Sequence, residues 1–117
     1  MNIEQFREFC LQKPLVTEEF PFGPETLVFK VAGKMFALTG LDSPELTVNL
    51  KADPDYSMEL REKYVEVQPG YHMNKLHWNT VSFEGSLPEE LLKELIDHSY
   101  LLVVASFSKS KRKELGI

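Results

Sequence analysis

The sequence predicts an α+β fold with two layers, in which helices pack on one face of an antiparallel sheet of about five strands. Apolar residues recur every three or four positions near both ends of the chain, a spacing typical of amphipathic helices. Short runs rich in Val, Phe and Thr fill the middle and are bounded by Gly, Pro and Asp, which is typical of strands and turns. The chain has 117 residues, enough for one core and a single domain over residues 1–117.

A first helix is expected over residues 2–13. The apolar side chains that share one face of this helix are Ile3, Phe6, Phe9 and Cys10. Asn2 followed by Gln5 is the pattern of a capping box, and Pro14 ends the helix because it cannot continue the helical hydrogen bonds. Cys10 is the single cysteine, and its place on the apolar face predicts a buried structural thiol.

Three strands are expected next, after a loop over residues 14–25. Residues 26–31 and 34–40 have the composition of strands, and Gly33 between them permits a tight hairpin turn. Residues 46–52 supply a third antiparallel strand, which completes a meander.

A second helix is expected from Asp53, as its N-cap, to about Tyr64. Pro54 falls in the first turn, where its missing N–H costs no hydrogen bond. Two short strands follow over residues 65–69 and 78–84, so the sheet has five strands in this prediction.

The last helix is expected to be the longest and to cover the core. Ser86 stands three residues before Glu89 with Pro88 between them, the pattern of a capping box. The positions that continue in helical phase are Leu91, Leu92, Leu95, Ile96, Ser99, Leu102, Val103 and Phe107. The basic run at 108–113 has two interpretations: the end of this helix, where cations interact favourably with the helix dipole, or an arm that binds phosphate.

The net charge of −5 is unevenly distributed. Segments 1–29 and 83–108 carry −3 and −4, residues 30–82 carry −1, and residues 109–117 carry +3. An acidic chain is poorly suited to cover polyanions over its whole surface, because phosphate binding depends on Lys and Arg. With one cysteine, no apolar run of about 18 residues and a charged N-terminal segment, the protein is expected to be cytoplasmic, with no membrane partner.

The stretch PGYHMNKLHW, residues 69–78, concentrates polar side chains after a Pro-Gly turn signal. The spacing of His72 and His77 matches neither one face of a helix nor one face of a strand. No Cys, Asp or Glu lies between Glu66 and Glu84, so further metal ligands are lacking nearby in the sequence. No metal site is therefore expected.

The same stretch can bind nucleic acid if its polar side chains face solvent. Together with the hairpin turn it supplies candidate residues for contacts with phosphates and base edges, namely Lys34, His72, Asn74, Lys75 and His77. In the alternative interpretation these side chains hold the loop together. Asn74 then forms an Asx turn, a histidine bonds nearby backbone, and Trp78 anchors the loop in the core.

Catalytic chemistry is not indicated by any motif. The chain contains no Gly-x-Ser-x-Gly sequence and no glycine-rich phosphate loop. Glu18 and Glu19 are acidic loop residues in this prediction, expected to be solvated rather than to act as general acids or bases. We therefore expect no catalytic residue and no cofactor.

Three segments resemble the MmcQ/YjbR family of small bacterial proteins: EEFPFGPETLVFKVAGKMFAL at 18–38, PGYHMNKLHWNTV at 69–81 and HSYLLVV at 98–104. The resemblance covers almost the whole chain, and its most specific element is the His-x-Asn-Lys-x-His-Trp block. It implies a CyaY-like fold related to type III secretion chaperones, and a double wing of loops proposed to bind DNA. The wings would be the turn around Gly33 and Lys34 and the loop that holds His72, Asn74, Lys75 and His77.

We therefore expect a non-enzymatic binding protein of the MmcQ/YjbR type, with DNA as its partner at the double-wing loops. An alternative is a protein-interaction or chaperone-like module that uses the exposed sheet face and the aromatic loop EEFPFGPE, without nucleic acid. A third hypothesis is a small-ligand site or an enzyme beneath that loop.

Overall fold

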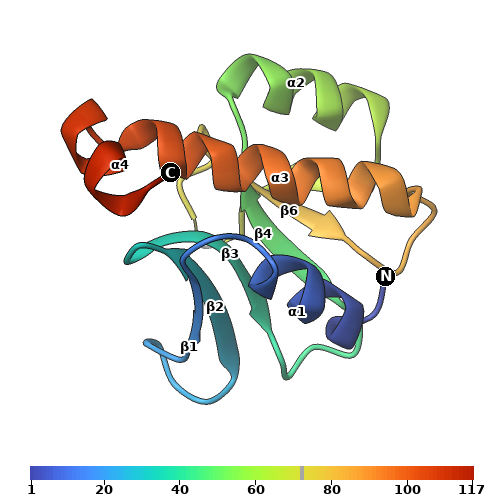
Figure 1. Ribbon diagram of the computed structural model, residues 1–117. Coiled ribbons are helices and arrows are strands. Elements are labelled where there is room, and N and C mark those ends of the chain that lie inside the picture. The colour runs from blue at the N-terminus through green and yellow to red at the C-terminus, as the bar shows by residue number, and fades with distance from the viewer. Residues whose placement is uncertain (72) are drawn as a thin grey trace.

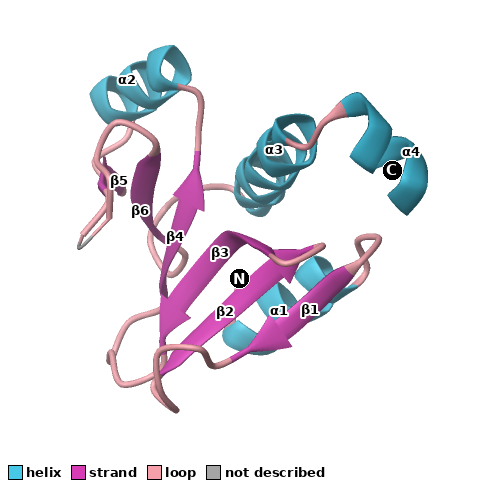
Figure 2. Cartoon of the chain, turned by 90° about the vertical axis from the view of Figure 1, so that its left-hand side faces the viewer, coloured by secondary structure: helices cyan, strands magenta, loops and turns pink. Residues whose placement is uncertain are grey.

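The computed structural model describes residues 1–71 and 73–117 of the chain. These residues form a six-stranded antiparallel sheet with helices on one face, the two-layer α+β architecture that the sequence predicts (Figure 1). The helices are α1 (Ile3–Leu11), α2 (Pro54–Lys63), α3 (Glu89–Ser106) and α4 (Lys109–Leu115). The strands are β1 (Val16–Glu19), β2 (Thr26–Val31), β3 (Lys34–Gly40), β4 (Thr47–Lys51), β5 (Val67–Pro69) and β6 (Trp78–Ser82). Their order in the sheet is β1-β2-β3-β4-β6-β5, with β1 and β5 at the two edges (Figure 2).

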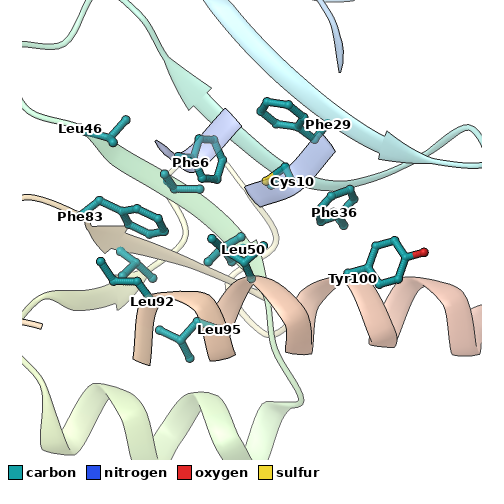
Figure 3. Close-up of a cluster of buried hydrophobic side chains, with 14 of the residues drawn as sticks. Phe6, Cys10, Phe29, Phe36, Leu46, Leu50, Phe83, Leu92, Leu95 and Tyr100 are labelled. Carbon is teal, nitrogen blue, oxygen red and sulfur yellow. The ribbon is translucent and has the colours of Figure 1, made fainter. Parts of the chain in front are cut away.

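One core joins the sheet to α1, α2 and α3 (Figure 3). Phe6 of α1 is fully buried and meets Phe29 and Phe83 edge-on, with ring centroids 5.2 and 5.5 Å apart. Cys10 lies in the same core without exposed surface, as predicted, and burial raises the pKa of its thiol. The thiol therefore stays protonated at neutral pH and acts as a small apolar group.

Strand register divides the side chains between two faces of the sheet. Phe29 and Val31 face the helices and belong to the main core. Val28, Leu38 and Trp78 point to the other face and form a second, smaller cluster. Partly buried methionines from β3 and from the loop between β5 and β6 pack on this second cluster, so apolar contacts stabilise both faces.

The registers also place two loops at the same end of the sheet. Lys34 begins β3, Lys51 ends β4 and Trp78 begins β6, and antiparallel pairing brings these positions to one end. The β2–β3 turn and the loop over residues 70–77 therefore project from that end. β4 lies between β3 and β6 in the strand order, and β3 pairs with β4 only at Ala37 and Leu38.

Most of the predicted elements agree with the structure. The capping box of Asn2 and Gln5 is formed at the start of α1, and Asp53 caps α2 with Pro54 in its first turn. Gly33 has a φ of 88° in the β2–β3 turn, a conformation that glycine adopts readily.

The segment 14–25 is only partly a loop, because Val16–Glu19 forms β1 and pairs with β2. Glu18 of β1 accepts two hydrogen bonds from Arg7 of α1, from Nε to Oε2 at 2.6 Å and from Nη2 to Oε1 at 2.7 Å. A four-residue strand with one apolar residue has little pattern of its own. Its pairing with β2 and the ion pair to α1 stabilise it, and both partners are distant in sequence.

The predicted capping box at the start of the last helix is wrong. Pro88 is the N-cap of α3, and the hydroxyl and N–H of Ser86 both donate to the Glu66 carboxylate instead. Ser86 stands two residues too early to cap, and Glu66 provides a competing acceptor. The long helix also ends at Ser106 instead of continuing into the basic run, which forms α4 with Ser108 as its N-cap. Among the described helices, none has the length and apolar character needed to cross a membrane.

Replacing Phe6 by alanine should lower the free energy of unfolding by about 3–5 kcal/mol, because the change leaves a cavity between α1 and the sheet. Urea unfolding followed by circular dichroism measures this difference. Phe22→Ala is the matched control, since Phe22 is 64% exposed and its loss should change stability by about 0.5 kcal/mol or less. Equal effects of the two changes would contradict the role of Phe6 in the core.

Candidate nucleic-acid interface

The loop over residues 70–77 connects β5 to β6 and is held by bonds within itself. The Nζ of Lys75 donates to the carbonyl oxygen of Gly70 at 2.9 Å. The Oδ1 of Asn74 accepts the N–H of Leu76 at 2.9 Å, so Asn74 forms the Asx turn that was one of its two interpretations. These hydrogen bonds stabilise the conformation of the described loop residues in the absence of a ligand.

Trp78 anchors the end of this loop. Its side chain is 6% exposed and packs with Val28 and Leu38, as the core-anchor interpretation predicted. Gly70 lies against it across the hairpin, where an added Cβ would stand 2.9 Å from both the Cβ and the carbonyl oxygen of Trp78. Only glycine fits at this position, so the Pro-Gly signal has a steric cause.

Arg61 of α2 connects the loop to the rest of the protein. Its Nε donates to Oδ1 of Asn79 at 2.7 Å, and its Nη2 donates to the carbonyl oxygens of Lys75 and Trp78. Asn79 is 2% exposed, and its Nδ2 donates a hydrogen bond to the hydroxyl of Ser57, also in α2. Sequence reasoning missed Arg61 because its partners are 14 to 18 residues away and two of them are backbone carbonyls.

Of the two histidines in the stretch, His77 is exposed, and its carbonyl oxygen accepts the N–H of Ala52 at 3.0 Å. This backbone bond ties the loop to the residue that follows β4, while the imidazole stays at the surface. The candidate His72 lies outside the described residues.

Lys34 is exposed at the β2–β3 turn and points toward the end of α3. Its Nζ lies 3.3 Å from the hydroxyl of Ser106 and 4.9 Å from the ring centre of Phe107. Both neighbours are neutral, so they position the ammonium group without cancelling its charge. This contact also brings the turn next to α4, which begins two residues after Phe107.

The ion pairs found in the described residues lie elsewhere. They are Arg7 with Glu18, Lys13 with Asp97, and Lys30 with Glu19. Hydrogen bonding by Arg7 lowers the pKa of Glu18, and hydrogen bonds from Thr17 and Lys30 lower the pKa of Glu19. Both carboxylates are therefore charged at neutral pH and engaged with cations, an environment that favours a structural over an acid-base role.

Seven cations lie on the two loops, at the end of β4 and on α4, and we term them the basic rim. They are Lys34, Lys51, Lys75, Lys109, Lys111, Arg112 and Lys113. Lys51 ends β4, the strand between β3 and β6, with Nζ 5.8 Å from the ring centre of Trp78. The basic run is thus not the end of the long helix, because it forms α4, and Ile117 after α4 packs against the core.

His98 of α3 is held in its neutral form. Its Nε2 accepts the N–H of Asp53 at 3.1 Å, and its ring meets Tyr56 edge-on with centroids 4.8 Å apart. Burial lowers the pKa of His98, although the carboxylates of Asp53 and Glu94 act in the opposite direction. Within residues 1–71 and 73–117, no three His, Cys, Asp or Glu side chains converge in the manner of a metal site.

Comparisons with known proteins agree on one family. The YjbR family model matches residues 11–102. The uncharacterized protein YbdF of Escherichia coli O157:H7 is 39% identical over 112 residues, which cover 96% of this chain and 92% of that protein. The uncharacterized protein YjbR of Escherichia coli strain K12 is 32% identical over 115 residues, 98% of each chain.

Solved structures confirm the fold. The crystal structure of DR2400 from Deinococcus radiodurans, a DUF419 protein, superposes with a TM-score of 0.94 at 45% identity. The match covers 99% of this chain and 88% of that one. A crystal structure from Pseudomonas syringae gives a TM-score of 0.75 at 30% identity and covers 87% of this chain and 98% of its own.

Replacing Arg61 by methionine should lower the free energy of unfolding by about 2–3 kcal/mol, because the buried amide of Asn79 and the carbonyls of Lys75 and Trp78 lose a charged donor. Amide hydrogen exchange at Leu76, His77 and Trp78 should accelerate, since the loop loses its link to α2. Lys63→Met, on an exposed position of the same helix, is the control and should leave both measurements nearly unchanged. Unchanged exchange in the Arg61 variant would show that the loop does not depend on this residue.

Acid should destabilise the protein partly through His98. Its pKa in the folded state is lower than the ordinary 6.5, so the unfolded chain binds the proton more readily. The stability that neutral His98 confers is complete above the unfolded pKa and decreases as the pH falls from there toward the folded pKa. Unfolding measured over this range should show a flatter pH dependence in His98→Gln, whose amide oxygen can still accept the Asp53 N–H. Parallel curves for the parent and the variant would contradict this role.

Proposed function

The chain belongs to the YjbR family, and we propose that it binds the phosphate backbone of duplex DNA along the basic rim. The observation that carries this proposal is the presence of seven cations on the two loops, the end of β4 and α4 in a protein whose net charge is −5. Lys34 and Lys75, two residues expected from the sequence, lie on the loops that frame this end.

The chemistry of the rim suits phosphate. An ammonium group has three donors, and Lys34 and Lys75 each use one on a neutral oxygen, from a hydroxyl and a carbonyl respectively. In the part of the chain that the structure describes, neither ammonium group forms an ion pair, so its charge is available to phosphate oxygens. Contacts of this kind position a protein on the duplex and carry no base sequence by themselves.

The described residues of the loop, 70–71 and 73–77, are organised before any contact with DNA. Its Asx turn, the bond from Lys75 to Gly70 and the guanidinium of Arg61 hold its backbone in one direction. Binding therefore requires less ordering of this loop, which reduces the entropic cost of association. The exposed side chain of His77 lies on the same loop and adds a polar contact.

The uneven distribution of charge favours one orientation of the protein on DNA. Segments 1–29 and 83–108 carry most of the negative charge and include α1 and α3 up to its end. A polyanion is repelled by these surfaces and attracted to the rim, so the uneven charge orients the approach.

The test is fluorescence anisotropy of a labelled DNA duplex titrated with the parent and with the double variant Lys34→Ala/Lys111→Ala, from about 50 to 200 mM salt. Each lost phosphate contact should reduce the slope of log K against log salt by about 0.9, so the double variant should lose about 1.8. The affinity of the double variant for DNA at low salt should also fall, because it has lost the same phosphate contacts.

Lys63→Ala/Lys93→Ala is the matched control, because it removes the same charge at the end of α2 and the beginning of α3, away from the rim. This control should keep the parent slope. Absence of binding at low salt, or an equal loss of slope in both double variants, would overturn the proposal.

Exposed aromatic residues favour a second candidate function, the binding of a protein partner. Phe20 and Phe22 are 50% and 64% exposed in the loop between β1 and β2, at the end of the sheet opposite the basic rim. A pocket of about 340 Å³ is lined by Phe20, Gly23 and Pro24. Exposed aromatic side chains of this kind are enriched at protein interfaces. The same anisotropy titration separates the two functions, since a protein-binding module without nucleic acid gives no signal at low salt.

A further inference from the structure

A groove runs between α2 and α3, two helices that the views in Figures 1 and 2 place next to each other. Two adjoining pockets, of about 420 and 210 Å³, make up this groove and share Tyr56 and Glu94 in their lining. None of the residues that line these two pockets belongs to the basic rim. The groove is therefore a separate feature, independent of the proposed DNA contact.

The floor of the groove is apolar. Leu60 belongs to the main core at 4% exposure, and Tyr64 and Leu91 pack against that core while still lining the groove. At the other end, Leu101 lines the groove and is 61% exposed, a large apolar side chain left in water. A partner that covers these side chains would gain the free energy of burying them.

The walls of the groove carry carboxylates from both helices. Glu59 of α2 and Glu94 of α3 face the side chain of Tyr56, and burial together with these two carboxylates and Tyr64 raises the pKa of the Tyr56 hydroxyl. Asp97 also lines the groove but is paired with Lys13. The groove thus carries one carboxylate from each helix beside Tyr56.

Lys63, at the end of the groove, does not neutralise the carboxylates of Glu59 and Glu94. Lys63 lies in the last turn of α2, with Nζ 5.4 Å from the ring centre of Tyr64. Among the ion pairs of the described residues, none involves Lys63, Glu59 or Glu94. Both central carboxylates remain available to a cation from outside.

We propose that this groove binds a basic amphipathic segment of another protein. Aliphatic side chains of the partner cover Leu101 at one end and Leu91 with Tyr64 at the other, and a Lys or Arg inserts between Glu59 and Glu94 beside the Tyr56 hydroxyl. A helix with apolar residues on one face and cations beside them presents both features at once. The charge of the walls selects such a partner over an acidic one.

The test uses a synthetic helical peptide of about 14 residues with leucine at every third and fourth position and lysine elsewhere. It is titrated into the ¹⁵N-labelled full chain, and backbone amide shifts report where it binds. The largest shifts should fall on residues of α2 and α3 that line the groove, with Tyr56, Glu94, His98 and Leu101 among them.

Charge-reversal variants distinguish the groove from general attraction to an acidic protein. Glu59→Lys/Glu94→Lys should weaken binding by about tenfold or more, because it places cations on both walls. Glu25→Lys/Glu84→Lys changes the net charge equally at exposed positions away from the groove and should weaken binding far less. An equal loss in both variants would overturn the proposal.

The apolar part of the contact has its own pair of variants. Leu101→Ser should weaken binding, whereas Leu41→Ser, at a residue 45% exposed elsewhere on the surface, should not. Both side chains are exposed, so neither change should disturb folding. Shifts spread over α1 and β1, or equally strong binding of a peptide with serine in place of leucine, would show attraction by charge alone and reject a groove contact.

Discussion

The arrangement of this protein depends on the burial of one sheet face beneath α1, α2 and α3. Side chains alternate between faces along a strand, so Phe29 and Val31 reach the core only in one register. A shift by one residue would expose them and bury Lys30, at a large cost in free energy. Phe6 strengthens this constraint, because its ring packs edge-on against aromatic rings from β2 and from the residue after β6.

The same register decides where the candidate functional residues meet. Once Lys51 pairs with Trp78 and β3 pairs with β4, the start of β3 and the start of β6 lie at one end of the sheet. The turn that carries Lys34 and the loop that carries Lys75 then share that end, although 41 positions separate these lysines in the sequence. The basic rim is a consequence of strand pairing, and α4 adds to it because α3 ends beside the turn.

Polar groups inside the protein link the helices to the sheet on both sides of β4. Ser99 of α3 is fully buried, donates to the carbonyl oxygen of Phe36 and accepts the N–H of Lys51. Arg61 performs a similar task from α2, where it binds Asn79 and the loop. One side of α2 is therefore hydrogen-bonded to the loop, and the other side lines the groove next to α3. The same short helix borders both the basic rim and the groove.

The sequence by itself determined the fold class and most elements, because amphipathic spacing, glycine turns and N-caps are local signals. It also determined the buried position of Cys10, whereas the burial of Trp78 belonged to one of two interpretations that the structure decided. Only the tertiary structure decided that residues 16–19 form a strand, that Ser86 bonds Glu66 and that the basic run forms a helix beside Lys34. Each of these depends on a partner distant in the sequence. A hydrogen bond or strand pairing with such a partner leaves no periodic pattern in the local sequence, so it cannot be predicted from that sequence.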